Sequence, residues 1–236
     1  MYRSINSAGG LCKEMLLLFA VFFLPGILFQ NGNVRPDAFD DPGYHFAVLV
    51  ISIPQALLIL HILHVRSQQA ESGRPLSTFG IRAVDGGAML KAVMAALGMF
   101  LLLALTGGVL LLLPSEIRDA FTTGLRFKVT NEALLPLALV SSLAIAYREE
   151  VFFRSYLLTR LQELGLGQPS AVLLAAGAFS LGHLYQGAGG AVVAFLLGLY
   201  LGWIFLRHRN VHVVALAHGL YNFAVLAATA AGFRLG

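Results

Sequence analysis

The stretch AVMAALGMFLLLALTGGVLLLL, residues 92–113, decides the fold class of this chain. It contains no charged side chain, and about 20 apolar residues are enough for an α-helix to cross the roughly 30 Å hydrocarbon core of a bilayer. The whole chain shares this character, because 58% of its 236 residues are hydrophobic, 12% are charged and the mean hydropathy is +0.78. A soluble domain of this size needs more charge to cover its surface. The sequence therefore predicts an all-α integral membrane protein.

Apolar segments on both sides of this stretch predict a polytopic bundle of about seven transmembrane helices (six to eight). No polar block is long enough to form a separate soluble domain, so we expect one membrane domain in two parts. Residues 1–132 would hold three helices and a connector, and residues 133–236 a four-helix core. Pro54 is expected to kink the second helix, and Pro169 to begin the fifth. The predicted helices cover residues 15–29, 46–65, 92–113, 133–163, 169–185, 191–206 and 211–231, with a loop at 114–131.

The charges between these segments predict an orientation and a location. The loop after the first helix carries three aspartates, whereas the connector at residues 66–91 and the turn RHRN at 207–210 are basic. Basic loops favour the cytoplasm, so we expect a cytoplasmic N-terminus and, without organellar signals, the bacterial inner membrane. We expect the first helix to be retained, because Glu14 interrupts the signal-peptide pattern and no small-residue cleavage site follows.

The net charge of +4 comes from basic residues scattered through short loops, so it predicts topology and no nucleic-acid partner. The single cysteine, Cys12, can form neither an intramolecular disulfide nor a thiolate metal site. The composition therefore predicts that the chain interacts with the lipid bilayer.

The segment REEVFFR, residues 148–154, places four charges inside the fourth predicted helix. Each costs roughly 2.5–3.5 kcal/mol on membrane-insertion scales, so such residues usually face the bundle interior. Glu150 and Arg154 are spaced i, i+4 with the acid first, the favourable order for an ion pair. Glu149 points elsewhere and is predicted to stay unpaired and face a cavity, where a carboxylate suits a general base. Arg148 is a flanking charge without an assigned role.

Three other polar residues are predicted to lie at a matching depth. Glu149 and His183 each lie about 14 residues, or about 21 Å, from the same end of their helices. His218 and Asn222 are i, i+4 neighbours on the last helix, as are Phe179 and His183 on the fifth. We therefore expect Glu149, His183, His218 and Asn222 to meet in one layer.

Other polar and small residues in the spans have structural explanations. His61 and His64 fall near a membrane interface, and His208 and His212 flank a turn, so we predict structural roles for all four. Gly198–Gly202 matches a small-xxx-small pattern, which predicts close helix packing.

Three motifs together resemble a known family. EEVFFR fits Glu-Glu-x-x-x-Arg, FSLGH fits Phe-x-x-x-His, and HGLYN fits His-x-x-x-Asn. In this order, on membrane helices of the C-terminal half, they resemble the CAAX-protease and bacteriocin-processing (CPBP, or Abi) family of glutamate-type intramembrane proteases. The resemblance covers about residues 133–231, and LSTFGIR, residues 76–82, is similar to the amphipathic linker found earlier in such proteins.

The resemblance implies a role for each motif position and no cofactor. Glu149 and His183 would activate water, and His218 and Asn222 would stabilise the oxyanion on the scissile carbonyl. Structural support would come from Glu150, Arg154 and Phe179. The implied substrate is a membrane-associated protein or peptide, such as a C-terminal membrane anchor or a leader-bearing precursor.

Two alternatives stay open at this point. One is a zinc-dependent version of the same protease, with Glu149, His183 and His218 as ligands, although the paired His-Glu-x-x-His spacing is absent. The other is a non-enzymatic protein: a scaffold, a bacteriocin-immunity protein, or a transporter that uses Glu149 as a proton relay. A transporter would be favoured by inverted repeats, and none is evident.

Overall fold

The computed structural model describes residues 8–28, 35–69, 75–122 and 127–232, and within these ranges all regular structure is helical. Four helices are long and apolar enough to cross a membrane, and a fifth apolar helix, Gln168–Leu181, is shorter. The predicted all-α membrane bundle is confirmed, whereas the number of about seven spans is not. The four helices cover Pro42–Gln68, Gly86–Leu111, Leu184–His208 and Val211–Ala230.

The N-terminal half follows the predicted pattern with two differences, one in the first helix and one after the third predicted span. The first helix is divided into α1 (Ala8–Phe22) and α2 (Leu24–Leu28). Pro54 lies inside the long helix α3 (Pro42–Gln69), which continues through the proline without a break. The cleanest predicted span becomes α4 (Gly86–Leu111). The segment after it, expected from the sequence to be a loop, instead contains α5 (Ser115–Thr122), whose polar and apolar residues alternate at helical spacing.

The charged stretch lies inside a continuous helical segment that changes its winding. Helix α6 (Leu135–Glu150) is followed by the π-helical segment η5 (Val151–Leu158) and then by α7 (Thr159–Glu163). Every residue of η5 is buried. Single stretches of π-helix are rare and frequently occur at functional sites, and this one begins directly after Glu150.

The last helices match the prediction except at one boundary that matters for the site. Helix α8 (Gln168–Leu181) ends four residues earlier than predicted, so His183 lies beyond it, before the short 3-10 helix η6 (Leu184–Gln186). Gly182 caps α8 and Gly187, at φ +80°, reverses the chain. Helices α9 (Gly187–His208) and α10 (Val211–Ala230) follow, joined by a tight turn.

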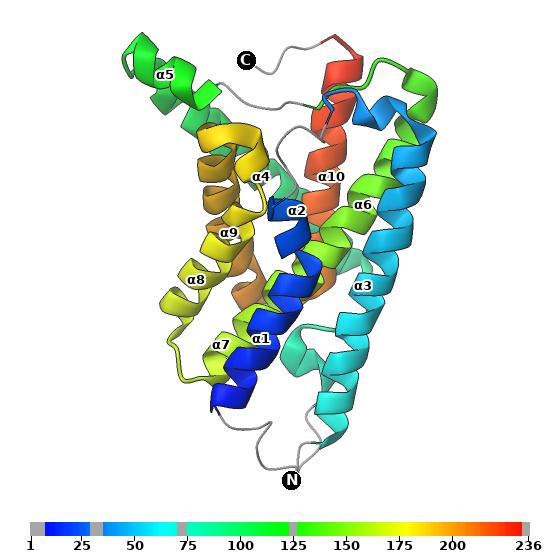
Figure 1. Ribbon diagram of the computed structural model, residues 1–236, viewed down its shortest axis with the longest axis vertical. Helices are drawn as coiled ribbons and strands as arrows, with labels where there is room; N and C mark the ends of the chain where they lie inside the picture. The colour runs from blue at the N-terminus through cyan, green and yellow to red at the C-terminus, as the bar shows by residue number, and fades with distance from the viewer. Residues whose placement is uncertain (1–7, 29–34, 70–74, 123–126, 233–236) are drawn as a thin grey trace.

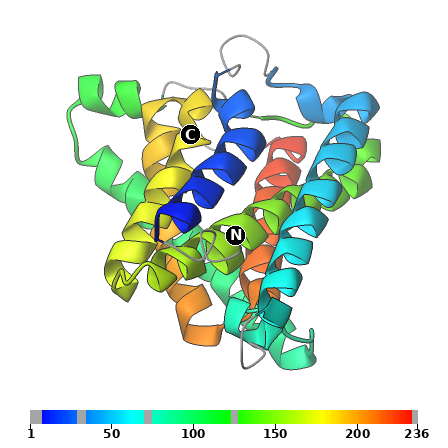
Figure 2. The ribbon, with the colours of Figure 1, turned by 60° about the horizontal axis from the view of Figure 1, so that its bottom comes forward.

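The α6–η5–α7 helix runs obliquely across the bundle, from beside α3 on one side to α8 on the other (Figures 1 and 2). Helix α10 packs against both α6 and α4, and α8 packs against α9. Aromatic rings of η5 form the centre of the core: Phe152 and Phe153 contact Phe23, and Phe153 meets Phe179 edge to face. The charged stretch is therefore enclosed by the other helices.

Helices α3 and α4 form an outer, lipid-facing layer. Only 17% of the spanning window of each is buried, against 50% for α9. Leucines such as Leu57, Leu101 and Leu105 are more than half exposed. In a bilayer these side chains meet acyl chains, so the exposed apolar surface fits a membrane protein.

At the acidic end of the bundle, Asp40 ties the segment before α3 to the start of α6. Its carboxylate accepts hydrogen bonds from the backbone N–H and hydroxyl of Thr130 and from the N–H of Asn131, at 2.6–3.1 Å. Burial alone would raise the pKa of Asp40, but these donors outweigh it and hold the pKa below its usual value. The ionised form therefore stabilises this connection at neutral pH.

The glycines of α9 allow close packing against α8, as the small-xxx-small pattern predicts. A Cβ atom added to Gly198 would lie 3.1 Å from the Ala176 Cβ and 3.2 Å from its Cα, and one on Gly202 would lie 3.0 Å from Val172. The carbonyl oxygen of Gly198 also accepts a bond from Arg154, at 3.3 Å. Gly198 therefore allows the close approach of α8 and α9, and its carbonyl oxygen binds the buried guanidinium of Arg154.

We predict that Gly198→Ala lowers the stability of the protein by about 1–3 kcal/mol, the usual cost of overpacking. Its new methyl group meets backbone as well as side chain, so α8 and α9 must separate. Gly177→Ala on α8 is the matched control, because nothing lies within 4 Å of its Cβ position. Thermal unfolding in detergent should show a lower midpoint for Gly198→Ala only; equal midpoints would contradict the packing argument.

Candidate active site

Glu150 lies at the end of α6 and is completely buried, with 0% of its surface exposed. The Nε atom of Arg154, which is 1% exposed, is 3.0 Å from Oε2 of Glu150. The ion pair predicted from the i, i+4 spacing is confirmed. Each of these two buried charges compensates the other. Removing one side chain would leave the opposite charge buried without a partner, which is strongly destabilising.

Arg154 is held by further contacts that include the predicted support residue Phe179. Its Nη2 donates to the carbonyl oxygen of Gly198, and its guanidinium carbon lies 4.9 Å from the centre of the Phe179 ring. An arginine over an aromatic face gains cation–π attraction, which is stronger away from water. Arg154 therefore connects η5 with α8 and α9.

Glu150 has a second partner that the sequence reasoning missed. Nδ1 of His218, on α10, lies 2.9 Å from Oε1 of Glu150. The carboxylate can only accept, so Nδ1–H donates to it and the imidazole Nε2 is left for other partners. The i, i+4 spacing predicts Arg154 as the partner of Glu150 and indicates no other. The structure shows that Glu150 bridges Arg154 and His218, a contact between helices that spacing along one helix cannot indicate.

Glu149 is also buried, with 8% of its surface exposed, and it is not unpaired as predicted. Nη2 of the adjacent Arg148 donates to Oε1 of Glu149 at 3.0 Å, and the Arg148 guanidinium lies 5.6 Å from the Phe23 ring centre. Sequence neighbours on a helix do not normally face each other, but the long arginine side chain folds back to reach the carboxylate. Arg148 thus gains a partner that the sequence did not assign.

Two predicted histidines act on Glu149 through space. His183 and His218 both interact electrostatically with its carboxylate. Nδ1 of His183 is 3.0 Å from the carbonyl oxygen of Phe179, which can only accept, so Nδ1 carries the proton and Nε2 keeps its lone pair. The Phe179 ring lies 4.5 Å from the His183 ring and 5.8 Å from the His218 ring. Two of the predicted residues, His183 and His218, therefore lie against Phe179.

Asn222 is the predicted site residue with the weakest link to this cluster. It lies one turn beyond His218 on α10 and is partly buried. Among the described residues, no hydrogen bond joins its amide to Glu149, His183 or His218. Its place on the same helix face as His218 is what the i, i+4 spacing predicts.

Two tyrosines near Glu149 were not predicted. Tyr44 at the start of α3 and Tyr185 in η6 both interact electrostatically with Glu149 and Arg148. The Tyr185 ring stacks on His183, with 6.3 Å between ring centres. Tyr44 is far away in sequence, and no local pattern marks it, so only the fold could bring it here.

His61, His64 and His212, for which structural roles were predicted, lie apart from the cluster. His61 and His64 are exposed on α3, on the outer layer. His212 hydrogen-bonds the Tyr147 hydroxyl at 3.1 Å, near the turn between α9 and α10. These positions agree with the structural roles predicted for them.

The alternative zinc site would use Glu149, His183 and His218 as ligands. Within the part of the chain that the structure describes, no three His, Cys, Asp or Glu side chains are arranged to hold a metal ion. Glu149, His183 and His218 lie within that part. In this arrangement they are not identified as such a group.

Fold and site together define a class of protein: a helical membrane protein whose core holds two adjacent glutamates at the end of α6, one histidine just after α8 and one histidine on α10. Residues 131–224 match a family model described as Rce1-like, type II CAAX prenyl endopeptidase Rce1-like. That model represents the CPBP (Abi) family, so the predicted resemblance is confirmed over this region of the chain. All predicted site residues lie inside the matched region. No curated protein and no solved structure matches the chain significantly.

Proposed function

We propose that this chain is a glutamate-type intramembrane endopeptidase. The family match supports an intramembrane endopeptidase, and the observation that carries the finer proposal is the position of Glu149. It is a buried carboxylate at the end of α6, within electrostatic reach of His183, whose Nε2 lone pair is not used by the protein backbone. A carboxylate and an imidazole acceptor can together orient and deprotonate one water molecule.

In the proposed reaction, Glu149 takes a proton from water while His183 holds the same water through Nε2. The resulting hydroxide attacks the scissile carbonyl carbon, and the carbonyl oxygen becomes an oxyanion. Glu149 then returns its proton to the leaving amine as the peptide bond breaks. Arg148 favours the ionised carboxylate at the start, because its guanidinium donates directly to Oε1. No serine or cysteine nucleophile takes part.

His218 and Asn222 are proposed to stabilise the oxyanion. Donors fixed before the reaction can supply a large part of the rate enhancement, since they need no reorganisation as charge develops. His218 would donate from Nε2, which requires protons on both ring nitrogens. Glu150, which accepts from Nδ1, then provides the compensating charge. Glu150 is therefore a positioning residue in this proposal, together with Arg154 and Phe179.

The proposed substrate is a membrane-associated protein or peptide, such as a C-terminal anchor or a leader-bearing precursor, cleaved in the bacterial inner membrane. The proposed cytoplasmic N-terminus is supported by the basic residues gathered at one end of the bundle. We call this the basic end and define it by Lys13, Arg66, Arg82, Arg160, Arg207 and Arg209.

The membrane proteome of cells tests this proposal and identifies the substrate in the same experiment. Cells that carry Glu149→Ala should accumulate the same uncleaved anchor or precursor as cells without the gene. Cells with Arg207→Ala, an exposed residue far from the site, should resemble the wild type. A Glu149→Ala proteome like the wild type, alongside an altered deletion strain, would instead favour the non-enzymatic scaffold. Cleavage that survives strong chelation would exclude the zinc version.

A further inference from the structure

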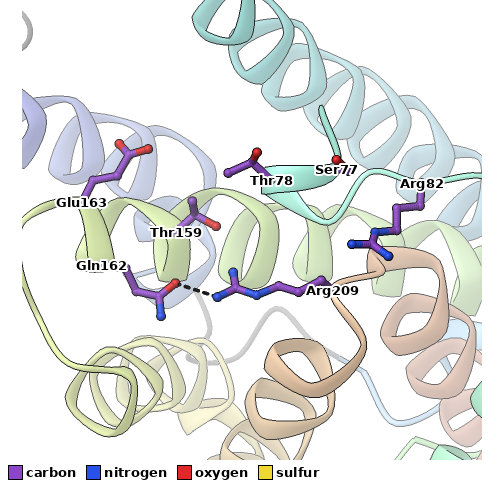
Figure 3. A pocket seen from close by; sticks show the side chains of 7 residues that line it. All are labelled: Ser77, Thr78, Arg82, Thr159, Gln162, Glu163 and Arg209. Carbon is purple, nitrogen blue, oxygen red and sulfur yellow. Dashed lines mark hydrogen bonds between the residues drawn. The ribbon is translucent and has the colours of Figure 1, made fainter. Parts of the chain in front are cut away.

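An open cavity of about 690 Å³, lined by residues with polar or charged side chains, lies at the basic end, away from the proposed catalytic residues. It is bordered by the short helix η3 (Leu76–Phe79), by α7 and by the turn between α9 and α10 (Figure 3). Nothing in the proposed peptidase reaction uses it. The residues that line it are Ser77, Thr78, Arg82, Thr159, Gln162, Glu163 and Arg209.

The cavity wall is fixed by packing and is not a loose loop. Phe79 is buried, and its ring lies under the Arg160 guanidinium, 5.6 Å from the ring centre. The N–H of Val211 donates to the Gly80 carbonyl oxygen at 2.8 Å, which ties η3 to the start of α10. A Cβ on Gly80 would lie 2.4 Å from the Phe205 ring, so only glycine permits this approach. The backbone that borders the cavity is therefore held in place.

Arg209 reaches the cavity from an uncommon backbone conformation. Its φ of +46° is the one positive value at a non-glycine residue among the described positions. The side chain donates to Gln162 at 3.4 Å (Figure 3). Burial and the nearby positive charge of Arg82 lower the pKa of Arg209. Two guanidinium groups thus face the same space and repel each other.

The cavity supplies little negative charge to offset these arginines. Glu163 is its one acidic lining residue, and the Glu163 carboxylate already forms an ion pair with Arg160. Thr159 also lines the cavity, is buried, and its hydroxyl has no hydrogen-bond partner among the described residues. The cavity therefore has an excess of positive charge and of hydrogen-bond donors, which fits a bound anion.

We propose that this cavity binds a phosphate group, supplied by the headgroup of an anionic phospholipid. A phosphate has several acceptor oxygens that point in different directions. It can therefore accept hydrogen bonds from two guanidinium groups and from nearby hydroxyl groups at the same time. Basic pockets at the ends of transmembrane helices are typical sites for anionic headgroups. Trp203, exposed on α9, lies six residues, or about 9 Å, before Arg209, and tryptophan commonly marks the headgroup level.

Thermal unfolding of the full-length protein in a neutral detergent tests this inference. The probes are phosphatidylglycerol, phosphatidylcholine and inorganic phosphate, each titrated separately. We expect phosphatidylglycerol to raise the midpoint of the wild type more than phosphatidylcholine does. Arg82→Gln should weaken the apparent affinity about tenfold, because a charged hydrogen-bond donor is lost. Arg207→Gln is the matched control, since Arg207 is an exposed arginine of the same turn that does not line the cavity.

Arg209→Gly separates binding from folding. Glycine adopts a positive φ without strain, so this variant should unfold at the wild-type temperature or above, yet lose the phosphatidylglycerol response. Equal responses in the wild type, Arg82→Gln and Arg209→Gly would overturn the inference and indicate general charge attraction. The absence of a response to any of the three probes would also overturn it. A response to inorganic phosphate without one to lipid would support the phosphate site and assign it a soluble source. Glu149→Gln should keep the full lipid response, so this test does not depend on the proposed peptidase activity.

Discussion

Glu149→Gln is expected to reduce peptide-bond cleavage by about 10²–10⁴-fold or more, the contribution usual for general acid–base catalysis. The amide has the size of the carboxylate and can still accept a bond from Arg148 through its oxygen, so the side chain should keep its place beside His183. It cannot take a proton from water at neutral pH. The expected loss is therefore in kcat, with little change in the affinity for substrate.

The measurement uses purified protein and the precursor that accumulates in the Glu149→Ala cells. Cleavage is followed by the appearance of the new N-terminus, and thermal unfolding reports the fold. Glu116→Gln, on the exposed helix α5, makes the same chemical change far from the site and should cleave like the wild type. If Glu149→Gln cleaved the precursor at the wild-type rate, Glu149 would not be the general base.

The helical architecture was predictable because hydrophobic length is a local property. Apolar stretches indicated the positions of α3, α4, α9 and α10 within a few residues. The number of spans was less predictable, because α1 ends before Pro25, α8 is short, and the fourth helix changes its winding at Val151. A π-helical segment has no characteristic amino-acid composition, so the sequence does not indicate where one occurs.

The candidate site was predictable where its contacts follow one helix. The Glu150–Arg154 pair follows from the i, i+4 spacing of the two residues. The hydrogen bond between Glu150 and His218 and the approach of Tyr44 depend on how separate helices pack. The end of α8 at Leu181 was also missed, because Gly182 is compatible with a helix as well as with its end.

Glu150→Gln is expected to destabilise the protein by about 3–5 kcal/mol. The change leaves the Arg154 guanidinium, 1% exposed, without its counter-charge, and an uncompensated buried charge is among the most costly single changes. At about 2–4 °C for each kcal/mol in a protein of this size, the unfolding midpoint should fall by roughly 10 °C. Glu163→Gln, at the basic end, removes the charge from a more exposed ion pair and should cost much less.

The double variant Glu150→Gln, Arg154→Met separates the two functions of Glu150. Methionine removes the buried charge and fills much of the same space, so most of the lost stability should return. Cleavage should not return with it, because His218 still lacks the carboxylate that balances a second proton on its ring. We expect a low kcat, a nearly unchanged KM and a pH profile displaced from that of the wild type. If the double variant regained both stability and the wild-type pH profile, Glu150 would serve only to pair Arg154, and the proposed oxyanion donor would have to act without it.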